Sequence, residues 1–196
     1  MMLSSAKVDW MIRRLYPDHQ LDRQCVTTTL RRFLIDAYKT YYPTVENWYD
    51  NKLIGGFRNG TRIIHIVLLR GGETAGVSIV KLSAKPYNKL CTFFLAHRVR
   101  DMGIGTALME TTLQSLTYGG REKALLITVP EEGAVESEKG PTFIDFLRRS
   151  GFSPIDVVPD RYRQGKNEII FMHPCTPDGV KSENKAVPRA EDPRNK

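Results

Sequence analysis

The alternation of apolar and polar positions predicts a block of consecutive strands in the middle of the 196-residue chain. Residues 62–69 (RIIHIVLL) and 74–81 (TAGVSIVK) are short apolar runs separated by the turn sequence GGE, a pattern that predicts a hairpin. Residues 89–96 (KLCTFFLA) predict another buried strand, because aromatic and β-branched side chains fit a pleated sheet.

Helices and further strands are expected on both sides of this block. Before it, we expect a strand over 8–16, a helix over 21–38 and a second helical segment from Pro43 to about Leu53, with chain breaks at Gly55-Gly56 and Asn59-Gly60. After it, the pattern predicts a helix over 104–116, a strand over 124–129, a helix over 141–150, a late hairpin strand from Val157 and a last strand over 167–172.

This order, β-α-α-β-β-β-α-β-α-β-β, predicts an α/β protein. Hairpins come first and helical crossovers follow, so we expect a mixed, mostly antiparallel sheet flanked by helices. The composition, 41% hydrophobic and 26% charged, suits one globular domain over residues 1–173. Residues 174–196 hold four prolines and nine charged side chains, and we expect this tail to be disordered.

Several protein classes are disfavoured by what the sequence lacks. No apolar run reaches the roughly 18 to 20 residues that span a bilayer, so we expect no membrane association. The N-terminus shows no secretory signal, and Cys25, Cys91 and Cys175 lack metal-ligand spacing. We therefore expect a cytoplasmic protein without a metal.

The net charge of +7 leaves three interpretations open. A basic surface attracts nucleic acid, and RNA is one such partner. The same charge suits a phosphorylated, strongly anionic cofactor. It also suits a solvated surface that only aids solubility.

The most informative segment is residues 100–106 (RDMGIGT), which joins the strand ending at Ala96 to the helix beginning near Ile104. Glycines let the backbone approach a ligand closely, and the first amides of a helix form a site for anions such as phosphate. The same spacing also suits an ordinary tight turn. The segment lacks the third glycine of the dinucleotide fingerprint and the lysine of a nucleoside-triphosphate loop.

Arg100-x-x-Gly103-x-Gly105 resembles the Q/R-x-x-G-x-G/A signature of the GNAT acyl-CoA-dependent N-acetyltransferases. A helix ending in Gly-Phe, residues 146–152 (FLRRSGF), is similar to a later segment of that family. The resemblance covers residues 8 to 173. It implies a GNAT-like fold, acetyl-CoA as the acyl donor, and two strands that splay apart between 92–96 and 126–129.

The resemblance also implies which residues bind the cofactor. The backbone amide of Leu95 would contact the thioester carbonyl, and the loop would hold the pyrophosphate. The implied cofactor-binding residues are Phe94, Leu95, Arg100, Asp101, Met102, Gly103, Ile104, Gly105 and Thr106.

The proton-transfer groups depart from the family pattern. The tyrosine often found on the last helix corresponds to Leu147, and the asparagine often found seven residues earlier corresponds to Gly140. Glu131, directly after a strand, and Tyr162, in the late hairpin, are the replacement candidates for catalysis. Each also fits a purely structural role, as a solvated loop carboxylate and as a loop aromatic covering the sheet.

These observations predict an acetyl-CoA-dependent N-acetyltransferase in which a primary amine attacks the thioester directly in a ternary complex. A covalent acyl-enzyme is not expected, because Cys91 has no partnered base in the sequence. Two alternatives stay open: a toxin-like enzyme that acetylates aminoacyl-tRNA, and a non-catalytic CoA-binding or regulatory protein.

Overall fold

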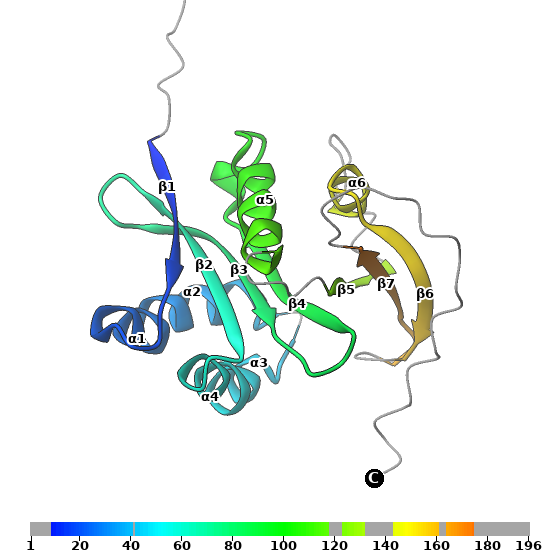
Figure 1. Ribbon diagram of the computed structural model, residues 1–196, viewed down its shortest axis with the longest axis horizontal. Coiled ribbons are helices and arrows are strands. Elements are labelled where there is room, and N and C mark those ends of the chain that lie inside the picture. Colours follow the sequence, from blue (N-terminus) through cyan, green and yellow to red (C-terminus); the bar gives the residue numbers. More distant parts are fainter. Residues whose placement is uncertain (1–8, 41, 118–122, 132–142, 161–163, 175–196) are drawn as a thin grey trace, which may run out of the picture.

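The computed structural model describes residues 9–40, 42–117, 123–131, 143–160 and 164–174. Within them, one sheet has the strand order β1-β2-β3-β4-β5-β7-β6 (Figure 1). Only β4 and β5 are parallel; every other neighbouring pair is antiparallel. The strands are β1 (Trp10–Leu15), β2 (Arg62–Leu69), β3 (Thr74–Lys81), β4 (Tyr87–Leu95), β5 (Ala124–Pro130), β6 (Ser153–Pro159) and β7 (Asn167–His173). The predicted mixed, mostly antiparallel sheet is confirmed.

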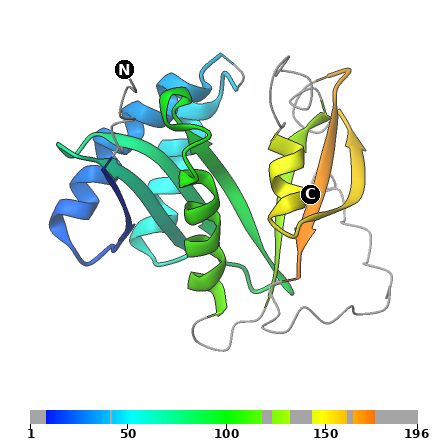
Figure 2. The same ribbon diagram turned by 90° about the horizontal axis from the view of Figure 1, so that it is seen from above.

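Helices cover both faces of the sheet (Figure 2). One face packs against α1 (Gln20–Thr27), α2 (Thr29–Tyr38), α3 (Val45–Trp48), the π-helical η1 (Tyr49–Leu53) and α4 (Ile54–Arg58). The other face packs against α5 (Ile104–Thr117) and α6 (Phe143–Arg149). A short 3₁₀ turn, η2 (His97–Val99), precedes the loop that leads into α5. No described helix is long and apolar enough to cross a membrane.

The predicted single helix over 21–38 is wrong, because the helix divides at Thr28. The φ and ψ angles of Thr28 are −122° and −77°, outside the helical range. The hydroxyls of Thr27 and Thr28 both donate to the carbonyl of Gln24, at 3.1 and 2.7 Å. Such local side-chain bonds compete with the regular helix, and they mark the junction of α1 and α2.

The predicted break at Gly55-Gly56 is also wrong, since both glycines lie inside α4. Gly56 has a packing reason to be glycine: a Cβ there would meet Cγ of Arg62 at 2.8 Å. The start of β2 thus approaches α4 closely. The break predicted at Asn59-Gly60 is confirmed, and Gly60 has the positive φ of 70° that favours glycine.

The feature that positions the site is the short pairing between β4 and β5. Their register covers Tyr87 with Ala124, Asn88 with Leu125, and Lys89 with Leu126. Beyond these pairs the strands diverge (Figure 2), while β5 stays paired with β7 as far as Pro130. The predicted splay is confirmed, and it begins just after Leu126.

Candidate functional site

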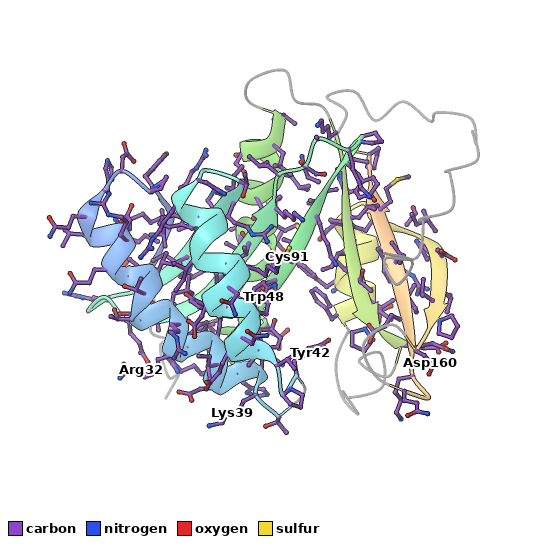
Figure 3. The ribbon with its side chains drawn as sticks, turned by 90° about the horizontal axis from the view of Figure 1, so that it is seen from below. Arg32, Lys39, Tyr42, Trp48, Cys91 and Asp160 are labelled. Atoms are coloured by element: carbon purple, nitrogen blue, oxygen red, sulfur yellow. The ribbon has the colours of Figure 1, made fainter. Side chains whose placement is uncertain are left out.

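A cavity of about 430 Å³ lies where β4 and β5 diverge. Residues 89–93 of β4 and 127–130 of β5 form two of its walls, and Phe143 of α6 closes one side. The opposite side comes from the end of α2, from residues before α3 and from α3 itself. Figure 3 labels Tyr42 and Trp48 on this side, with Cys91 on the neighbouring β4. The residues that this side contributes are Tyr38, Tyr42, Thr44, Val45 and Trp48.

The backbone of β4 directs amides into this gap. The amide of Ala96, just after β4, donates to the carbonyl of Ala75 in β3 at 2.8 Å. Because backbone groups alternate in direction along a strand that pairs antiparallel, the amides of Phe93 and Leu95 face away from β3, toward the gap. The carbonyl of Leu95 accepts a hydrogen bond from Nε of Arg100 at 3.3 Å. Leu95 and Arg100, both predicted cofactor residues, therefore lie together at the open end of the splay.

Consecutive phenylalanines on β4 point to opposite faces of the sheet. The ring of Phe94 packs against Phe33 and Tyr38, each with a centroid distance of 5.5 Å. The ring of Phe93 stacks on Phe146 at 5.4 Å and lines the cavity. Sequence reasoning named Phe94 and missed Phe93. The period-2 alternation could have signalled that only one of the two lines the gap.

The N-terminus of α5 presents backbone donors beside this gap. The first intrahelical hydrogen bond of α5 runs from the amide of Ala107 to the carbonyl of Gly103, at 3.1 Å. The amides of the three preceding residues, 104–106, therefore have no acceptor within the helix. Thr106 is exposed, whereas the side chain of Ile104 is buried, so Ile104 offers only its backbone to a ligand.

The two glycines of the loop serve different purposes. Gly103 has a φ of 76° and open space around it, so it is favoured by the backbone conformation alone. Asp101, with a φ of 62°, has the same left-handed geometry, and Met102 between them is exposed. Gly105 is a position of close approach, since a Cβ there would meet Cδ1 of Leu95 at 3.2 Å and Cε2 of Phe146 at 3.6 Å.

The α6 helix directs phenyl rings toward β4. Phe143 and Phe146 both stack on Phe93, at 5.9 and 5.4 Å. Leu147, at the family's tyrosine position, is fully buried in the core. Neither of the stacked rings carries a hydroxyl that could protonate a thiolate. Gly140, the family's asparagine position, lies outside the described residues.

The carboxyl end of β5 brings two carboxylates near the cavity. Glu131 is exposed, follows the cavity-lining Pro130, and accepts a hydrogen bond from Nδ2 of Asn167 at 2.9 Å. Glu168, on β7, is fully buried and lies opposite Pro130 in the strand register. Sequence reasoning missed Glu168 because it begins an apolar strand. Tyr162, the other catalytic candidate, lies outside the described residues.

Phenols and a thiol complete the chemistry of the cavity. Burial, together with the nearby Tyr42, raises the pKa of Tyr38, and the positive charge of Arg100 partly opposes this shift. The Tyr38 hydroxyl thus stays protonated at neutral pH. Cys91 lies within 3.9 Å of the Arg62 guanidinium and 3.6 Å of the Lys89 carbonyl, and neither group is a base. Within the described ranges, no cluster of three or more His, Cys, Asp or Glu side chains could hold a metal ion.

Comparison with solved structures identifies the fold. No protein-family model matches the sequence, and no curated protein matches it. A GNAT-family acetyltransferase from Desulfovibrio desulfuricans superposes with a TM-score of 0.63 at 18% identity, over 85% of this chain and 99% of that chain. The ribosomal-protein-S18-alanine N-acetyltransferase of Escherichia coli gives 0.62 at 16% identity, over 89% and 99%.

A third solved structure is a cofactor complex. An aminoglycoside 6'-N-acetyltransferase bound to coenzyme A superposes with a TM-score of 0.61 at 13% identity, over 87% of this chain and 99% of that chain. Each of the three structures superposes on this chain over nearly its whole length. At these identities the likeness establishes a shared fold.

Proposed function

We propose that this chain, which has the GNAT fold, is an acetyl-CoA-dependent N-acetyltransferase that acts on a primary amine in a ternary complex. The observation that carries the proposal is the divergence of β4 and β5, with the N-terminus of α5 at the open end. A strand gap of this kind lets an extended ligand pair with exposed backbone, and the helix terminus suits a phosphate.

Acetyl-CoA fits the groups present at this gap. The pyrophosphate would lie on the amides of residues 104–106, with the Thr106 hydroxyl and the Arg100 guanidinium as further donors. The first turn of α5 contains no acidic residue, so no carboxylate within that turn repels the phosphates. The pantetheine arm would pair with the exposed backbone of β4, including the amide of Phe93, and the Leu95 amide is left for the thioester carbonyl.

The transfer needs one bond to form and one to break. The amine nitrogen attacks the thioester carbon, a C–N bond forms, and the C–S bond breaks to release the CoA thiolate. The Leu95 amide, directed into the gap, would stabilise the oxyanion of the tetrahedral intermediate. Glu131 would accept the amine proton through water, and solvent would return a proton to the thiolate.

One structural observation favours a rival function, a protein that binds CoA without turnover. In the helix that carries the family's proton donor, the rings of Phe143 and Phe146 stack on β4, and neither of them can donate a proton. Positioning the two reactants already removes a large part of the barrier, so catalysis does not depend on that donor alone.

Release of the CoA thiol separates these functions. The protein is incubated with acetyl-CoA and a mixture of primary amines, and free thiol and acetylated amine are both measured. Amine-dependent thiol release with matching amide product supports the enzyme. Tight acetyl-CoA binding without amide formation from any amine supports the non-catalytic protein.

A further inference from the structure

The acceptor side of the cavity has a chemistry of its own, set by three aromatic side chains. We propose that the acceptor is a small primary amine whose amino group is joined to an aromatic ring by a short alkyl chain. Polyamines and peptide N-termini are expected to be poor acceptors. This inference rests on the proposed function and specifies its substrate class. The wall that carries it consists of Tyr38, Tyr42 and Trp48, and is called the aromatic wall below.

The aromatic wall is built before any ligand binds. The rings of Tyr38 and Tyr42 lie 6.0 Å apart at 51°, and Tyr38 is backed by Phe94 at 5.5 Å. Trp48 packs edge-on against Tyr49, with an interplanar angle of 80°. Tyr49 is itself fixed, because its hydroxyl donates to the carbonyl of Val26 at 2.6 Å. A flat ring entering the cavity thus meets rings already held in place, an arrangement that favours edge-to-face and offset contacts.

The charges around the wall disfavour a polycation. Among the described residues that line the cavity there is no Asp or Glu, and Lys89 is the charged one. The carboxylates of the adjoining helices already have basic partners: Asp50 pairs with Arg31 at 2.8 Å, and Asp36 pairs with Lys39 at 3.5 Å. A ligand with several positive charges would therefore lose hydration at the aromatic wall without meeting a carboxylate there; the described carboxylates near the cavity, Glu131 and Glu168, lie beside Pro130 instead.

The same surroundings favour reaction of a neutral amine. An ammonium group transferred from water into an apolar cavity has a lowered pKa, because desolvation penalises the charged form. The cavity therefore selects the deprotonated amine, which is the nucleophile. This effect lessens the demand on Glu131 as the general base.

The size of the cavity limits the acceptor as well. Its volume of about 430 Å³ includes the space between β4 and β5 that the thioester end of the cofactor would fill. The remaining space suits a single ring with a short amine-bearing chain.

Tryptophan fluorescence provides a binding assay that is independent of turnover. The chain has two tryptophans, and Trp10 lies on β1, away from the cavity. In the Trp10→Phe variant, Trp48 alone reports on the aromatic wall. The variant is first saturated with CoA. It is then titrated separately with 2-phenylethylamine, with its non-aromatic analogue 2-cyclohexylethylamine, with spermidine and with tri-alanine. We expect a change in Trp48 emission that saturates at the lowest concentration for 2-phenylethylamine.

Turnover with acetyl-CoA then tests the residues. Trp48→Leu and Tyr42→Leu should each raise the KM for 2-phenylethylamine about tenfold or more, since aromatic anchors dominate such contacts, and should leave the acetyl-CoA dissociation constant unchanged. Tyr16→Leu is the control, because this half-exposed tyrosine stacks near Arg14, outside the cavity. Its KM should equal that of the parent protein.

The outcomes separate the inference from the function on which it rests. If acetyl-CoA binds and spermidine or tri-alanine is bound or acetylated in preference to 2-phenylethylamine, the inference is overturned and the acetyltransferase stands. If 2-phenylethylamine binds beside CoA but is never acetylated, the aromatic site is supported and the catalytic proposal fails. An unchanged KM in both wall variants overturns the role of the aromatic wall.

Discussion

At the scale of single residues, Gly105 is a position where α5 approaches both β4 and α6 closely. A Cβ at this position would meet Leu95 and Phe146 at 3.2 and 3.6 Å, beside the predicted path of the cofactor. We expect Gly105→Val to weaken acetyl-CoA binding at least about tenfold, because the added carbon atoms would displace Leu95 or Phe146 beside the gap and overpacking costs about 1–3 kcal/mol. Isothermal titration of the folded variant measures the loss.

Gly55→Ala is the matched control for that substitution. Gly55 lies inside α4 with no atom within 4 Å of the added Cβ and no positive φ. Alanine should therefore stabilise the helix by about 0.5–1 kcal/mol and leave acetyl-CoA affinity unchanged. Equal affinity in the Gly105 variant and the control would contradict the assigned cofactor path.

His65 makes stability depend on pH. Burial, assisted by the charge of Arg14, lowers its pKa to about 4, whereas an unfolded histidine titrates near 6.5. The unfolded state then binds more protons than the folded state between these values, so stability is lost as the pH falls through that window. We expect His65 to contribute a loss of about 3 kcal/mol between pH 7 and pH 4. Urea denaturation at both pH values measures it, and His65→Gln should show a smaller loss.

The candidate residues illustrate what the sequence can and cannot predict. The Arg100–Thr106 loop could be located because its glycines and its strand-to-helix setting are local. The choice between Phe93 and Phe94 depends on which face of β4 meets the gap. Leu147 matches the family's spacing, yet Phe146 is the residue that stacks on Phe93. Which of two adjacent residues of α6 faces β4 depends on how the helix is rotated about its axis. That rotation is set by packing and is not visible in the sequence.

At the scale of elements, a buried hydroxyl pair ties α5 to the sheet. Thr112 donates to the Leu108 carbonyl at 2.7 Å, so Ser78 on β3 donates to Thr112 at 2.6 Å. Thr112→Val leaves the Ser78 hydroxyl without this acceptor, and we expect a loss of about 1–3 kcal/mol of stability. Thr117→Val, an exposed position on the same helix, should change stability little. Chemical denaturation compares them, and equal effects would exclude a role for the pair.

The helix boundaries predicted from the hydrophobic pattern were wrong at two places, Thr28 and Gly55-Gly56. The strands of the central block follow their apolar runs closely, since period-2 alternation and turn glycines are strong local signals. The division at Thr28 arises from threonine hydroxyls that compete with the helix. The error at Gly55-Gly56 is of another kind: Gly56 lies close to Arg62 of β2, and no local pattern contains this contact.

At the scale of the whole molecule, the cavity joins segments far apart in the chain. Tyr38 and Trp48 precede β4 by some 40 to 50 residues, and Phe143 follows it by as many again. Their meeting depends on the helices that pack on opposite faces of the sheet. The sequence identified the splay through family resemblance, but the aromatic wall became visible only in three dimensions.

A thiol-protection experiment tests whether acetyl-CoA occupies this cavity. Cys91 lines it, whereas Cys25 lies outside it, and burial raises the pKa of the Cys25 thiol. We expect acetyl-CoA to slow alkylation of Cys91 and to leave the rate at Cys25 unchanged, as measured by mass spectrometry of the digested protein. Slowing at both cysteines would instead indicate a global change in stability.

The most direct test of the account is calorimetric titration of the full chain with acetyl-CoA, beside CoA and ATP. A ligand that occupies both the N-terminus of α5 and the gap between β4 and β5 needs a pantetheine arm as well as phosphates. We predict micromolar affinity for acetyl-CoA, about −8 kcal/mol, and no measurable binding of ATP. A folded protein that binds no acetyl-CoA, or that binds ATP as tightly, would contradict the assignment of the splayed strands as a cofactor site.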